Sequence, residues 1–144
     1  MSEHDVVRRL LIDRACPEDV VEGGLPGLVD RYEAIVKSVE EGYAFGLDDY
    51  LNDMDLRDTL FAVMAVILPD ERAAVEGRVD ALDARLRAVT VASPCLWGDD
   101  VEEDDGLDPG REWWYYVRPA KLTEDFANEL SAWGLLGDDT QSDL

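Results

Sequence analysis

The sequence predicts a mainly α-helical protein, a single-domain bundle of about five helices with a small two-stranded β element. Apolar residues recur at i, i+3, i+4 and i+7 through most of the first ninety positions, which is the helical period. Two later segments, 89–97 and 111–118, are instead rich in β-branched and aromatic residues. Apolar residues make up 47% of the 144 positions, enough to bury one core. We expect one domain over 1–134 and a disordered tail over 135–144.

The first two helices are predicted over residues 5–16 and 26–42. Asp5 can cap the first helix and Pro17 suits its end, while Gly42 suits the end of the second. The connector between them, PEDVVEGG, has room for about one helical turn. Its continuation, GGLPG at 23–27, lacks the Lys-Ser/Thr pair of a phosphate-binding loop, so we interpret it as a turn.

Two further helices are predicted over 47–68 and 71–89. The first, with room for a bend near Met54–Asp55, becomes apolar on all sides in its second half, which is typical of a covered helix. Pro69 ends it. The apolar positions of the second step alternately by four and three over only two heptads, which favours a packed antiparallel neighbour over a dimeric coiled coil.

The last part of the chain combines two predicted strands with one helix. The strands, 89–97 and 111–118, flank a long acidic loop that contains Gly98, Gly106 and Gly110. The final helix covers 123–133, with Thr123 as its N-cap.

The charge balance excludes several classes of ligand. Thirty-four acidic residues oppose 13 basic ones, for a formal net charge of −21 at pH 7. Such a field repels polyanions, so direct binding to nucleic acid or to an anionic membrane is not expected. The longest apolar run, LFAVMAVIL at 60–68, is too short to cross a bilayer.

The N-terminus does not resemble a signal peptide, because acidic residues stand where positive charge is required and Arg8 and Arg9 interrupt the apolar stretch. Cys16 and Cys95 are therefore expected to be reduced thiols in a cytoplasmic protein.

Known catalytic and metal-binding patterns are poorly matched. His4 is the single histidine, near the chain's start, so triad catalysis and zinc binding lack ligands, and we expect no cofactor. A calcium-loop alignment across 101–112 fails because Val101 falls at the first ligand position. Asp49 and Asp53 share a helix face and are weak candidates for a divalent metal, although a solvated helix face explains them better.

One segment, DDVEEDDGLDPGREWWYYVRP at 99–119, places a dense acidic run beside four consecutive aromatic residues. In a strand, Trp113 and Tyr115 would share one face, covered by the core or presented to a partner. The second alternative predicts a partner-binding surface that combines rings with carboxylates. Its candidate residues are Asp99, Asp100, Glu102, Glu103, Asp104, Asp105, Trp113 and Tyr115.

Three explanations of the acidity remain open. The chain is an acidic protein-interaction module, such as an immunity protein, an antitoxin or a nucleic-acid-mimicking inhibitor, that binds a basic partner protein. Alternatively, it is a salt-adapted soluble protein, since Asp outnumbers Glu and Arg outnumbers Lys. In the third explanation it is an enzyme with an unrecognised carboxylate or metal site, although no catalytic residue can be assigned.

Overall fold

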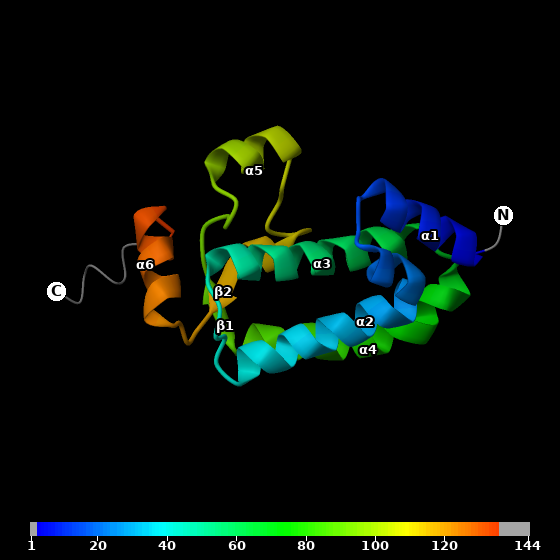
Figure 1. Ribbon diagram of the computed structural model, residues 1–144, viewed down its shortest axis with the longest axis horizontal. Coiled ribbons are helices and arrows are strands. Elements are labelled where there is room, and N and C mark those ends of the chain that lie inside the picture. The colour runs from blue at the N-terminus through cyan, green and yellow to red at the C-terminus, as the bar shows by residue number, and fades with distance from the viewer. Residues whose placement is uncertain (1–2, 136–144) are drawn as a thin grey trace.

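The computed structural model describes residues 3–135 and confirms a mainly helical fold with a small two-stranded sheet (Figure 1). The predicted tail lies outside the described residues except for Leu135, which is buried. The elements in chain order are α1 (Glu3–Asp13), α2 (Glu18–Glu40), α3 (Leu47–Val66), α4 (Pro69–Ala88), β1 (Thr90–Ala92), α5 (Asp99–Asp105), the 3₁₀ turn η1 (Trp113–Tyr115), β2 (Val117–Pro119) and α6 (Glu124–Ala132).

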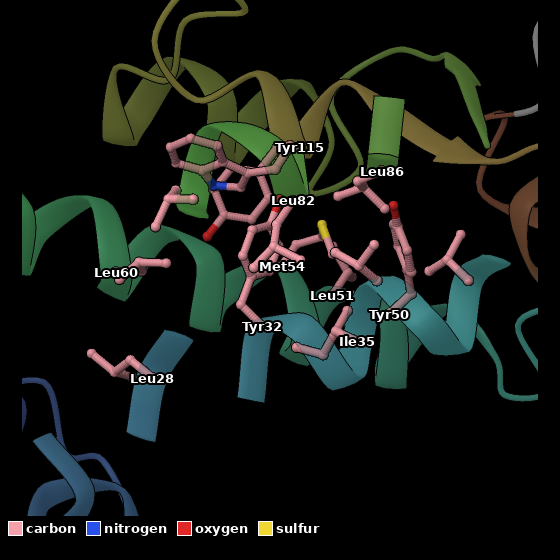
Figure 2. Packing of buried hydrophobic residues seen from close by; sticks show 14 of the residues in the cluster. Leu28, Tyr32, Ile35, Tyr50, Leu51, Met54, Leu60, Leu82, Leu86 and Tyr115 are labelled. Atoms are coloured by element: carbon pink, nitrogen blue, oxygen red, sulfur yellow. The ribbon is translucent and has the colours of Figure 1, made fainter. Parts of the chain in front are cut away.

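Three long helices, α2, α3 and α4, lie side by side and form the body of the molecule (Figure 1). Helix α1 packs on α2 and α3 at one end, while η1 and α6 pack on α3 toward the other. Apolar side chains from α2, α3, α4 and the η1 segment meet between these elements (Figure 2). The predicted stripe of α4 is buried through Val79, Leu82 and Leu86. The expected antiparallel neighbour is wrong, because α4 packs mainly on α2, which runs parallel to it.

The predicted connector before the second helix is itself helical, so α2 begins at Glu18 rather than at residue 26. A short helical run before Gly24 and a longer one after it are joined across a kink at this residue, whose φ of 60° lies in the left-handed region. Glycine reaches this region without steric cost, and Pro26 then occupies an early position of the following run, where its missing N–H is tolerated. The kink lets one chain segment cover both α1 and α3.

The predicted two-stranded element is present, but its strands are shorter than the segments 89–97 and 111–118. Only three residues on each side pair, antiparallel, with Val91 opposite Arg118. Residues 113–115 form a 3₁₀ turn, closed by the Tyr116 N–H donating to the Trp113 carbonyl at 2.9 Å. A strand would turn Trp114 and Tyr115 to opposite faces, whereas the 3₁₀ turn lets both rings enter the core beside α3. Burial of two large rings outweighs the local strand preference of the sequence.

A buried ion pair joins the three long helices. Arg57 of α3 is 6% exposed and donates through Nε and Nη2 to Asp83 of α4, at 3.0 and 2.9 Å. Tyr32 of α2 donates its hydroxyl to the same carboxylate at 2.5 Å. The Arg57 guanidinium lies 4.4 Å from the ring centroid of Trp114. Burial lowers the pKa of Arg57, but its bonds to Asp83 more than offset this, so the pKa lies above its ordinary value and the group stays charged.

Replacing this arginine is predicted to destabilise the protein strongly. Arg57→Met leaves the mostly buried Asp83 carboxylate without its cation, which should cost about 3–5 kcal/mol of unfolding free energy in urea denaturation. The double variant Arg57→Met with Asp83→Leu removes both charges and should recover much of that loss.

The matched control is Arg78→Met, which breaks an exposed pair with Asp30 and Glu33 and should change stability little. Equal effects of Arg57→Met and Arg78→Met would show that the buried pair does not hold the helices together.

Candidate functional site

The acidic run predicted as a loop is a short helix, α5, flanked by two glycines in left-handed backbone conformations. Gly98 has φ 93° and Gly106 has φ 66°, and the Gly106 N–H donates to the Glu102 carbonyl to end the helix. Acidic residues in the first turn favour helix formation through the helix dipole. Those at its C-terminal end, Asp104 and Asp105, oppose it, so α5 depends on contacts outside itself.

Contacts with the aromatic segment and the following loop hold α5 in place. The Tyr116 hydroxyl donates to the Glu102 carboxylate, and the Leu107 N–H donates to the Glu102 carbonyl at 3.0 Å. Arg111 donates to the Gly106 carbonyl at 2.7 Å and also pairs with the buried Glu112. Glu102 is thus the one carboxylate of α5 with a structural role, and the others face solvent.

The predicted partner-binding residues separate into the carboxylates of α5 and the two rings Trp113 and Tyr115, and among the carboxylates Glu102 is held by Tyr116. Asp99, Asp100, Glu103, Asp104 and Asp105 are exposed on α5, which stands away from the α2–α4 body (Figure 1).

Tyr115 is 4% exposed and donates to Asp55 of α3 at 2.5 Å, so its ring belongs to the core and not to the predicted surface. Trp113 is half-buried, and the Arg87 guanidinium carbon lies 4.1 Å from the centroid of its ring.

Trp97 is an exposed aromatic residue of this region that is not among the predicted partner-binding residues. It is 38% exposed, stands two residues before the start of α5, and its ring centroid lies 6.4 Å from that of Tyr115. Its position next to Gly98 and the acidic run was the available signal in the sequence. We define the acidic surface as the exposed carboxylates of α5 together with Trp97.

The weak metal candidates have structural contacts. Asp53 accepts a hydrogen bond from the Tyr43 hydroxyl at 2.5 Å, and Asp49 lies 3.5 Å from the Gly46 N–H at the start of α3. Among the side chains that the structure describes, no three His, Cys, Asp or Glu gather closely enough to hold a metal ion. Cys16 and Cys95 are free thiols. No described helix is both long and apolar enough to cross a membrane.

Arginine side chains on the body are largely engaged with carboxylates. Arg78 pairs with Asp30 and Glu33, and Arg85 pairs with Glu40, which joins α4 to α2 in parallel orientation. Other pairs join Arg14 to Asp58, Arg31 to Asp19 and Arg111 to Glu112. These arginines are thus neutralised by carboxylates of the same fold, and the excess negative charge resides on surface carboxylates outside these pairs.

Two carboxylates of α3 predict a stability maximum in mild acid. Burial raises the pKa of Asp53 and of Asp55, against the opposing effect of their tyrosine donors. Because the folded protein binds these protons more readily than the unfolded chain, the free energy of unfolding should rise as the pH falls from neutral through the raised pKa values toward the ordinary value of 3.8. Asp53→Asn keeps an acceptor for Tyr43 but cannot titrate, so it should flatten part of this rise in denaturation curves collected across the range.

Exposed ion pairs have the opposite effect on the free energy of unfolding at lower pH. Arg31 lowers the pKa of Asp19, and Arg85 lowers that of Glu40, so their contributions are lost only as the pH falls through those depressed values. A steady fall in the free energy of unfolding as the pH falls from neutral toward 3.8 would contradict the assignment of Asp53 and Asp55 as carboxyls with raised pKa.

Comparison with known proteins adds no relative: no family model matches this chain, and neither a curated protein nor a solved structure resembles it significantly.

Proposed function

We propose that this protein is an acidic interaction module of the cytoplasm, which binds a basic protein in the manner of an immunity protein, an antitoxin or a nucleic-acid-mimicking inhibitor. The observation that carries the proposal is α5, a helix with six acidic residues out of seven that stands off the body of the molecule (Figure 1). An acidic element so exposed attracts a basic surface and raises the rate of association with it.

The charge density of α5 supports the mimicry of nucleic acid. A helix rises about 1.5 Å per residue, so the seven residues of α5 span roughly 10 Å. Six carboxylates over that length give about one charge per 1.7 Å, which is the linear density of duplex DNA. A protein built to neutralise phosphates would therefore meet a comparable field at α5.

Trp97 provides the acidic surface with an apolar contact, which can add the affinity that electrostatic attraction alone does not give. Exposed carboxylates accelerate encounter but add little affinity once they are screened by salt. Aromatic rings at an interface contribute affinity by burying a large apolar area. Trp97 sits at the start of α5, where a partner attracted by the acids would contact it.

Neutralising α5 is predicted to abolish most partner binding. The variant Asp99→Asn, Asp100→Asn, Glu103→Gln, Asp104→Asn and Asp105→Asn retains Glu102, which Tyr116 requires. A basic protein is first captured from lysate of the source cells at low salt, and its affinity for the wild type and the variant is then measured by calorimetry. We expect at least a hundredfold loss, and displacement of bound duplex DNA from the partner by wild type only.

The matched control removes five exposed carboxylates elsewhere. Its substitutions are Asp13→Asn, Glu22→Gln, Glu41→Gln, Asp48→Asn and Asp125→Asn. This variant has the same net charge as the α5 variant, and it should lose far less affinity. Similar losses in both would show that total charge, and not α5, directs binding. Recovery of no basic protein would count against the proposal altogether.

Salt titration distinguishes the proposal from adaptation to a salty environment. If the acidity serves a partner, the helical circular dichroism signal should persist from 2 M to 0.1 M sodium chloride. Over this range the screening length grows from less than about 3 Å to about 10 Å. A salt-adapted protein of this charge would instead lose its helical signal at the low end, through repulsion between its surface carboxylates.

A further inference from the structure

A hollow between α3 and α4 combines both signs of charge with an apolar wall. Its volume is about 400 Å³, within the roughly 300–1,000 Å³ typical of small-molecule sites. Arg57 and Arg72 line it together with Glu76 and Asp80. None of these residues belongs to the acidic surface defined above.

The innermost polar group of the hollow has an unused hydrogen-bond donor. Arg57 is 6% exposed, and its Nε and Nη2 are taken by Asp83, but its Nη1 is buried without a partner. A buried donor without an acceptor is costly, at about 1–3 kcal/mol. An oxygen acceptor from the hollow would complete the hydrogen bonding of this guanidinium, once the side chains that now cover Nη1 move aside to admit it.

A second guanidinium stands beside it with donors to spare. Arg72 donates through Nε to the Met64 carbonyl at 2.7 Å, which fixes it against α3. No ion pair to Arg72 is found within the described part of the chain, although Glu76 follows it by one helical turn. In a protein with this excess of carboxylates, two arginines with unused donors at one hollow are a notable concentration of positive charge.

The remaining lining residues define the other parts of a ligand. Phe61 and Met64 of α3 provide an apolar wall, and Phe61 is 39% exposed. Glu76 and Asp80 are exposed, so they lie toward solvent relative to the buried Arg57. A simple anion would be opposed by these two carboxylates, whereas a simple cation would be opposed by the two arginines.

We propose that this hollow binds a small zwitterion with an apolar side chain, of the chemical class of the aromatic amino acids. Its carboxylate accepts from Arg57 Nη1 and from Arg72, and its ammonium group lies toward Glu76 and Asp80. The apolar side chain packs on Phe61 and Met64. This site is independent of the proposed binding of a basic protein, and either can fail without the other.

Three probes that share one ring test the proposal. L-Phenylalanine carries both charges, 3-phenylpropionate only the carboxylate, and 2-phenylethylamine only the ammonium group. In calorimetric titrations of the full chain, L-phenylalanine should bind saturably and at least about tenfold more tightly than either of the others, because each lost charge-assisted hydrogen bond costs about that factor. The Nε–H signal of Arg57 in NMR spectra should shift as the site fills.

Variants locate the site. Arg72→Gln should weaken L-phenylalanine binding about tenfold, while Arg72→Lys, which keeps the charge but not the planar fork, should lose less. Arg78→Gln lies on the same helix outside the hollow and should leave binding unchanged. Thermal melts establish that each variant is folded before it is titrated.

Three results would overturn the proposal: no saturable binding of L-phenylalanine at up to about 10 mM, equal binding of 3-phenylpropionate, or full affinity in Arg72→Gln.

Discussion

The buried guanidinium of Arg57 is the constraint around which the helices are arranged. A charge removed from water needs a partner of matching shape, and the Asp83 carboxylate supplies it through two bonds at 3.0 and 2.9 Å. That requirement fixes the register of α3 against α4. The hydrogen bond from Tyr32 to Asp83 links α2 to this ion pair, and the stacking of Arg57 on Trp114 links η1 to it. Apolar stripes alone would allow the helices to slide by a turn, whereas this cluster satisfies its charges in one arrangement.

Pairing between arginines and carboxylates also determines how charge is distributed over the molecule. Arginines are scarce relative to acids, and those of α4 bridge to neighbouring helices, as Arg78 does to Asp30 and Arg85 to Glu40. Each of these pairs is exposed and contributes little stability alone. Their collective effect is to cancel negative charge where helices lie close together. The densest run of carboxylates outside such pairs is then found on α5, which does not have to pack closely against another long helix.

Sequence periodicity predicted the helical body well, because burial of an apolar stripe is a strong and repetitive signal. Leu28, Tyr32 and Val39 recur at the expected spacing and are buried as a set. Arg57 was missed although it stands one turn from Met54 and from Leu60, both of which are fully buried. A charged residue in an inward position of a stripe is the signal that a buried ion pair leaves in a sequence. Its partner Asp83 stands four residues after the buried Val79 and three before the buried Leu86, so it leaves the same signal in α4.

The segment 89–119 was predicted less well because its structure is decided by distant contacts. Trp114 turns inward to meet Arg57, and Tyr115 turns inward to meet Asp55, and neither α3 partner can be identified from local composition. Their side-by-side burial requires the 3₁₀ turn and shortens the strand to Val117–Pro119.

The same contacts explain why the most acidic stretch of the chain adjoins its most aromatic one. The rings anchor the segment in the core, and Tyr116 reaches back to hold Glu102 of α5. A run of like charges could not form a stable short helix unaided. Beside an anchored aromatic turn, with Gly98 and Gly106 to reverse the chain at its ends, it can be held as a helix away from the body.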